Sequence, residues 1–145
     1  MLILLRHAQA GGGRPDRARH LTEKGIADAR RIGDWLRADG HLPARILCSP
    51  ATRTRETLDA LDLAAETAFP DDLYNAPTRV LLDHARDATA PLMIVAHNPG
   101  IAEAAAELAA PPPDHPAFGH YPPGACCVIG DDGAVLAFVT PKDLG

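Results

Sequence analysis

The chain has 145 residues, of which 46% are hydrophobic and 23% are charged, and its formal net charge is -5. This length suits one domain of ordinary size, and the composition excludes a disordered, collagen-like or coiled-coil protein. The first apolar run ends at Leu5, far short of a membrane span or the core of a signal peptide. We therefore expect a single cytoplasmic domain over residues 1–145 that does not associate with membranes.

Short aliphatic runs and longer helical patterns alternate along the chain. In chain order, the patterns predict a strand at Leu2 to Leu5, a helix from Thr22 to Asp39 and a strand at Arg45 to Cys48. They next predict helices from Ser49-Pro50 to about Leu63 and over Thr78 to Arg86, and a strand at Leu92 to Ala96. For the rest of the chain they predict a helix from Asn98-Pro99 to about Ala109, a loop at Pro111 to Pro123, and strands at Ala125 to Ile129 and Ala134 to Thr140.

Apolar spacing and capping residues distinguish these elements. The strands are dense aliphatic runs, which is typical of strands buried on both faces of a sheet. In the first helix, small or apolar residues recur at helical spacing along one face: Ile26, Ala29, Gly33 and Leu36. Ser49 and Asn98 are expected to cap two later helices, each followed by a proline at the first helical position.

The order of these elements predicts the fold class. Strands that alternate with helices form a mainly parallel sheet that is covered on both faces. The Asp131-Asp132-Gly133 turn joins the last two strands into an antiparallel hairpin at the edge of that sheet. We therefore expect an α/β fold with three layers, α/β/α.

Basic and imidazole side chains directly follow three of the predicted strands. The first strand runs into Arg6 and His7, the second is followed by Arg53, and the third runs into His97 and Asn98. Ligands of open α/β sheets bind beyond the carboxyl ends of the strands. We therefore expect two imidazoles and two guanidiniums to meet at one edge of the sheet.

Positive charge is concentrated in the first part of the chain. Residues 1–55 hold eleven of the fourteen Lys and Arg residues and only five of the nineteen acidic residues. A globally acidic chain does not suit general nucleic-acid binding, whereas a local basic region suits a single bound anion. Arg53 is expected in or next to the first turn of a helix, where the macrodipole disfavours a cation and favours an anion. Free N–H groups at the same helix start suit a phosphate-sized ligand.

Two histidines and two arginines can transfer a phosphoryl group by themselves. The chain has neither carboxylates clustered at the strand ends nor a glycine-rich phosphate loop, so we expect no metal site and no cofactor. A neutral imidazole can attack phosphorus, while arginines such as Arg6 and Arg53 hold the charge of the transferred group. His7 is the expected nucleophile because it follows a rigid strand, and His97 is expected to donate a hydrogen bond to the transferred group.

These residues also carry a family resemblance. Arg6 to Ala10 resembles the RHG signature of the histidine phosphatase superfamily, here in the form RHAxA, and Ser49 to Thr57 resembles its SPxxRxxxT segment. Val95 to Pro99 resembles the segment of its second histidine. Arg19 to Gly25 resembles the RpLTxxG stretch of the small SixA-like branch, and Tyr121 to Ala125 resembles that branch's turn before a strand.

The resemblance covers essentially the whole chain in order and implies a phosphoglycerate-mutase-like fold. It implies a phosphate pocket built from the phosphorylated nucleophile His7 together with Arg6, Arg53 and His97. It also implies that Arg19 lies by the pocket. We expect Asn98, at the second helix start, to bind the substrate as well.

The glutamate that protonates the leaving group in larger branches of the family has no clear counterpart here. Asp71, Asp72 and Asp83 are candidates by position only. An alkoxide leaving group needs that proton, whereas an imidazole leaves readily once it is protonated. This absence, and the lack of an insertion long enough to form a lid, favour a phosphohistidine on a protein as the substrate.

The sequence leaves three functions open. The leading hypothesis is a metal-independent phosphohydrolase that acts on a phosphorylated protein, such as a histidine-containing phosphotransfer domain, and releases inorganic phosphate. An enzyme with the same pocket could instead hydrolyse a small phosphate ester. A non-catalytic module could bind phosphate or a phosphoprotein without turnover.

Overall fold

A computed structural model describes all 145 residues, Met1 to Gly145. Six strands form one sheet: β1 (Leu2–Arg6), β2 (Arg45–Cys48), β3 (Glu66–Ala68), β4 (Leu92–Ala96), β5 (Cys126–Ile129) and β6 (Val135–Val139). The α-helices are α1 (Glu23–Ala38), α2 (Thr52–Leu61), α3 (Thr78–Arg86), α4 (Gly100–Leu108) and α5 (Pro141–Leu144). Two short 3-10 helices, η1 (Asp16–Ala18) and η2 (Asp71–Leu73), lie between them.

The strand order of the sheet is β3-β2-β4-β1-β5-β6. The first four strands of the chain run parallel, whereas β5 is antiparallel to β1 and β6 is antiparallel to β5. This confirms the predicted parallel sheet with an antiparallel edge hairpin. Because β4 lies between β1 and β2, the carboxyl ends of these three strands are neighbours, with Arg6 opposite Ala96 and Cys48 opposite Val95.

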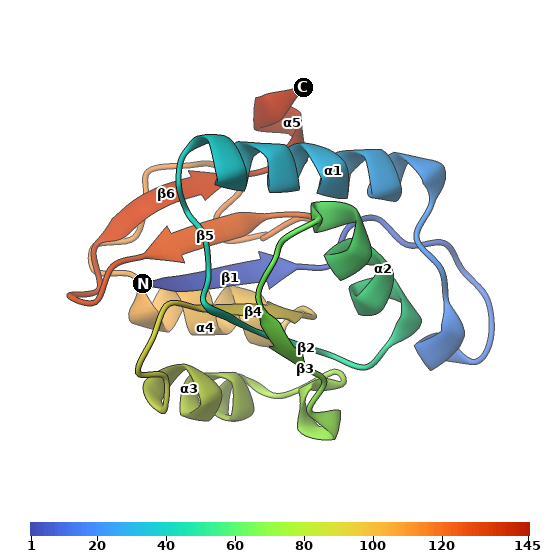
Figure 1. Cartoon of the computed structure of the whole chain (residues 1–145), viewed down its shortest axis with the longest axis horizontal. Helices are drawn as coiled ribbons and strands as arrows, with labels where there is room; N and C mark the ends of the chain where they lie inside the picture. Colours follow the sequence, from blue (N-terminus) through green and yellow to red (C-terminus); the bar gives the residue numbers. More distant parts are fainter.

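Alternate residues of the central strands face two separate cores, which explains why these strands are so apolar. On one face, Leu4 and Ile94 pack in a cluster with residues of α3 and α4. On the other face, Leu5 and Val95 pack in a cluster with residues of α1 and α2. In Figure 1, α1 and α5 lie above the sheet and α3 and α4 lie below it. The expected three-layer arrangement is therefore confirmed.

Three kinds of short element escaped the sequence analysis. The edge strand β3 has only three residues, of which two are exposed, so no aliphatic run reveals it. It forms because its backbone pairs with β2. The 3-10 helices and the four-residue helix α5 are likewise too short to show a period. None of the helices has the length and apolar character needed to span a membrane.

Both predicted helix caps are wrong. Helix α2 has Ala51 at its N-cap and α4 has Pro99, and neither N-cap has a side-chain hydrogen bond to its helix. The side chains of Ser49 and Asn98 instead bond to groups far away in the sequence, at the edge of the sheet. Asn98 therefore lines the pocket described next, and Ser49 bonds to His97, which also lines it.

Candidate active site

A polar pocket of about 300 Å³ opens at the carboxyl ends of the parallel strands. Its lining consists of Arg6, His7, Gln9, Ala10, Asp16, Arg19, Arg53, Asn75, His97, Asn98 and Pro123. The six site residues expected from the sequence are all in this lining: Arg6, His7, Arg19, Arg53, His97 and Asn98. The strand order explains this, because β1 and β4 are neighbours although they are far apart in the chain.

His7 lies deep in the pocket and is 8% exposed. Its backbone N–H donates to the carbonyl of Ala96 in β4 at 3.1 Å, which anchors the residue to the sheet. Its Nδ1 lies 2.7 Å from the carbonyl oxygen of Ala8. A carbonyl can only accept, so Nδ1 carries the proton and Nε2 keeps its lone pair. No group of the protein hydrogen-bonds this Nε2.

The charge state of His7 follows from its surroundings. Burial, reinforced by the positive charges of Arg6, Arg53 and Arg19, lowers the pKa of His7 to about 4, although the Ala8 hydrogen bond acts in the opposite direction. The imidazole is therefore neutral at physiological pH. A neutral ring with a free Nε2 lone pair is the nucleophilic form of histidine.

Thr57 of α2 holds the backbone that follows His7. The N–H of Ala8 donates to Thr57 Oγ1 at 3.0 Å, and the Thr57 hydroxyl donates to the carbonyl of Arg53 at 2.8 Å. Thr57 is 1% exposed, so both bonds are shielded from water. One buried hydroxyl thus joins the His7 segment to the helical turn that carries Arg53.

His97 follows β4 and is 3% exposed. Its ring centroid lies 5.4 Å from that of His7. Its Nε2 is 2.7 Å from Oγ of the fully buried Ser49, while its Nδ1 is enclosed and has no partner. Burial and the charge of Arg53 lower the pKa of His97 to about 3, so this ring is also neutral at physiological pH.

Two guanidiniums with unused donors line the same pocket. Arg6 donates from Nη1 to the carbonyl of Tyr121 at 3.1 Å. Arg53 is the second residue of α2, as expected from the sequence, and is 2% exposed. Its Nη1 donates to the carbonyl of Asp16 at 2.8 Å and its Nη2 to Asn75 Oδ1 at 3.2 Å. The Nε atoms of both arginines are buried without a partner, which is costly in free energy.

The carboxylate of Asp16 is part of the pocket, and the sequence analysis missed it. Its Oδ1 accepts from Nε of Arg19 at 3.1 Å, and its Oδ2 accepts from Nη2 of Arg53 at 3.2 Å and from the hydroxyl of Tyr74. The Tyr74 hydrogen bond and the charges of the two arginines hold the pKa of Asp16 well below its usual range, although burial acts against them. One signal could have revealed it, since Asp16 is the only acidic residue before Glu23 in a strongly basic segment.

Asn98 and Arg19 also hold the pocket wall together. Asn98 donates from Nδ2 to the carbonyls of His120 at 3.0 Å and Tyr121 at 3.1 Å, and its Oδ1 is buried without a partner. Arg19 donates from Nη1 to the carbonyl of Gly11 at 3.0 Å. Both side chains therefore link loops that come together only in the folded chain.

The three aspartates considered as proton donors do not line the pocket. Asp71 lies 3.5 Å from Arg17 and Asp72 lies 3.0 Å from His84, in both cases at the surface. Asp83 is exposed on α3. Asp16 is thus the one carboxylate of the lining, and it is ionised. No group of three or more His, Cys, Asp or Glu side chains is arranged to hold a metal ion.

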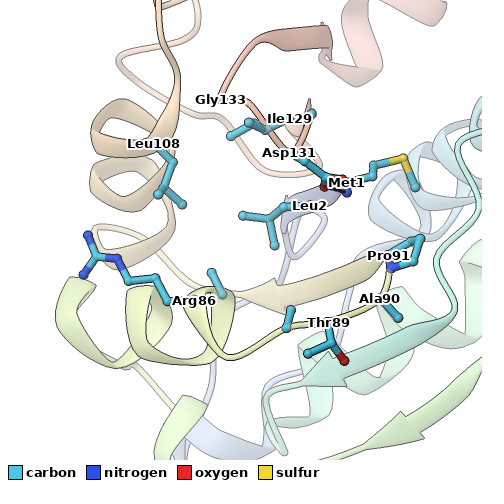
Figure 2. A pocket seen from close by; sticks show the side chains of 13 residues that line it. Met1, Leu2, Arg86, Thr89, Ala90, Pro91, Leu108, Ile129, Asp131 and Gly133 are labelled. Carbon is cyan, nitrogen blue, oxygen red and sulfur yellow. Dashed lines mark hydrogen bonds and ion pairs between the residues drawn. The ribbon is translucent and has the colours of Figure 1, made fainter.

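A second pocket, of about 440 Å³, lies near the amino ends of β1 and β4, opposite the site (Figure 2). Its charged groups are already paired: the amino group of Met1 with Asp131, and Arg86 with Glu107 at 3.8 Å. Its lining contains no histidine or cysteine. Of these two pockets, only the one around His7 therefore carries potential nucleophiles and free cationic donors.

Comparisons with known proteins identify the family of this chain. The sequence profile of the histidine phosphatase superfamily, branch 1, matches residues 2–73. The uncharacterized protein Rv1276c of Mycobacterium tuberculosis is 35% identical over 112 residues, which cover 72% of this chain and 70% of that protein. The structure of a protein assigned as the phosphohistidine phosphatase SixA of Nakamurella multipartitia is 32% identical, with a TM-score of 0.81 over 97% of this chain and 95% of that one. A protein of Agrobacterium tumefaciens with the same assignment is 26% identical, with a TM-score of 0.84 over 97% of each chain. The chain therefore belongs to the histidine phosphatase superfamily, in its SixA-like branch, with a phosphoglycerate-mutase-like fold.

Proposed function

We propose that this chain is a metal-independent phosphatase that removes the phosphoryl group from phosphohistidine on a cytoplasmic protein, through a phosphorylated His7. The observation that carries the proposal is the bond from His7 Nδ1 to the Ala8 carbonyl, which leaves the Nε2 lone pair free in an arginine-lined pocket. This arrangement presents a nucleophile to a bound phosphoryl group.

The reaction proceeds in two displacements. In the first, His7 Nε2 forms a bond to phosphorus while the bond to the leaving atom breaks, and the electron pair goes to that atom. Arg6 and Arg53 donate hydrogen bonds to the equatorial oxygens, where charge is held during an in-line displacement. In the second, water attacks the phosphorylated His7, releasing inorganic phosphate and restoring the free imidazole.

His97 acts in both displacements as a hydrogen-bond donor. Its Nδ1 is the ring atom without a partner in the protein, and the Ser49 hydroxyl, at 2.7 Å, can donate to Nε2. With Nε2 accepting from Ser49, the neutral ring carries its proton on Nδ1. That proton binds a phosphoryl oxygen, and Arg19 binds the substrate at the edge of the pocket. Asn98 holds the pocket wall, because both of its amide hydrogens already bond to backbone carbonyls.

The missing acid supports the proposed substrate class. The one carboxylate of the lining, Asp16, is ionised and cannot protonate an alkoxide. An imidazole that carries its own ring proton leaves without such help. The SixA assignment of two similar structures supports the same class of substrate.

Trapping the phosphoenzyme tests the proposal. The protein is incubated with labelled phosphoimidazole, quenched, and digested to locate acid-labile phosphate. We expect label on His7 in the wild type and none in His7→Ala. His120→Ala is the matched control, because His120 is exposed and does not line the pocket. Equal labelling of His7→Ala and the wild type would refute the mechanism.

Two other results would identify a different function. Hydrolysis of small phosphate esters without cleavage of phosphoimidazole or a phosphohistidine protein would indicate an ester phosphatase with the same pocket. Tight binding of inorganic phosphate without hydrolysis of para-nitrophenyl phosphate, whose leaving group needs no acid, would indicate a binding module.

A further inference from the structure

The carboxylate of Asp16 has one acceptor position left for a ligand. An ionised carboxylate offers about four acceptor sites. Arg19, Arg53 and Tyr74 use three of them, two on Oδ2 and one on Oδ1. The side chain is 49% exposed, so the remaining position on Oδ1 is open to an incoming group.

Asp16 lines the same pocket as His7 but is far more exposed to solvent, on the side from which a leaving group departs. His7 is 8% exposed and attacks from deep in the pocket. In an in-line displacement, the leaving group lies across the phosphorus atom from the nucleophile, and therefore on the open side. The half-exposed Asp16 is the only anionic side chain of the lining, so it is the one carboxylate that a leaving group in this pocket can meet.

An anionic acceptor in this place suits a nitrogen leaving group and not an oxygen one. A phosphohistidine ring can carry a proton on the nitrogen that does not bear phosphorus, and this N–H is a donor. The leaving oxygen of an ester has no such donor before the bond breaks. A carboxylate therefore attracts the protonated phosphohistidine ring and gives an ester nothing to bind.

We propose that Asp16 accepts a hydrogen bond from the ring N–H of the leaving imidazole and thereby selects phosphohistidine over phosphate esters. This inference rests on the function proposed above and identifies the side chain that recognises the leaving group. As His7 Nε2 bonds to phosphorus, the substrate P–N bond breaks and its electron pair stays on the leaving nitrogen. The ring proton remains on the other nitrogen, held by Asp16, and the imidazole departs neutral.

The partners of Asp16 keep it in the form that this role needs. Two arginines, Arg19 and Arg53, and the neutral hydroxyl of Tyr74 are the groups that bond to its carboxylate. They favour the ionised form, so Asp16 accepts and does not donate. Its charge in turn favours the protonated form of the bound phosphohistidine ring, whose imidazole is the better leaving group.

The test compares two small substrates on one variant. Values of kcat/KM are measured for phosphoimidazole and para-nitrophenyl phosphate with the wild type and Asp16→Asn. We expect the kcat/KM of the variant to fall about tenfold more on phosphoimidazole than on the aryl ester, a modest difference for a charge-assisted bond that is partly exposed. Asp16→Glu should recover part of the loss. Asp71→Asn removes a nearby surface carboxylate that is paired with Arg17, and should change neither value.

Each alternative outcome has a distinct meaning. An equal loss of kcat/KM on both substrates would show that Asp16 acts only by holding Arg19 and Arg53. An equal gain would show that Asp16 only competes with the phosphoryl group for these arginines. Either result overturns the proposal while leaving the phosphohistidine phosphatase function standing. A wild type that hydrolyses the aryl ester but not phosphoimidazole would overturn the proposed substrate class, and the role of Asp16 with it.

Discussion

Lowering the pH from about 7.5 to about 5 should destabilise the folded protein through His7 and His97. Burial lowers their pKa values to about 4 and about 3, whereas the pKa of a histidine in water is 6.5. At pH values below the pKa of a histidine in water and above these two lowered pKa values, the unfolded chain binds protons on both residues and the folded protein does not. The free energy of unfolding therefore falls as the pH falls. At about pH 5 the loss is about 2 kcal/mol for each residue, or about 4 kcal/mol together.

Urea unfolding followed by circular dichroism at the two pH values measures this loss. The His97→Asn variant has one buried imidazole fewer, so its free energy of unfolding should fall by about 2 kcal/mol less than that of the wild type. The His120→Asn variant is the control, since this exposed side chain meets water in the folded and unfolded states. The reasoning fails if His97→Asn loses as much stability as the wild type over the same interval.

Three further outcomes follow from the contacts around the pocket and from the proposed chemistry. Thr57→Val should lower the free energy of unfolding by about 2 kcal/mol and slow aryl phosphate hydrolysis, because the N–H of Ala8 loses its buried acceptor; a variant as stable as the wild type would contradict this. Gly33→Ala should lower the melting temperature despite the better helix propensity of alanine, because the new Cβ would lie 2.2 Å from the carbonyl oxygen of Leu61 at the α1–α2 contact. Treatment with a chelator should leave turnover unchanged, and a loss that a divalent metal restores would overturn metal independence.

The strands of the parallel sheet could be predicted closely from the sequence. The predicted ranges Arg45 to Cys48 and Leu92 to Ala96 coincide with β2 and β4. These strands face a core on both sides, so their composition alone separates them from the surrounding helices and loops. The edge strand β3 has no such composition, because what defines it is pairing with β2 and not burial.

The helix starts show where local patterns mislead. Ser49 and Asn98 are each followed by a proline, a typical N-terminal signal. In the structure, Ser49 bonds to His97 and Asn98 bonds to the carbonyl of Tyr121. Each of these side chains hydrogen-bonds to a partner from another segment, which only the folded chain brings within reach.

The sequence by itself determined the fold class, the family and the six residues expected in the pocket, because buried strands and the residues at their ends leave a local signature. Only the tertiary structure determined the proton positions and charge states of those residues and the carboxylate beside them. It showed that Nδ1 of His7 carries the proton, that both histidines are neutral, and that Asp16 rather than Asp71, Asp72 or Asp83 is the carboxylate of the site. Proton positions and charge states depend on burial and on hydrogen bonds between segments distant in the chain, and these exist only after the chain has folded.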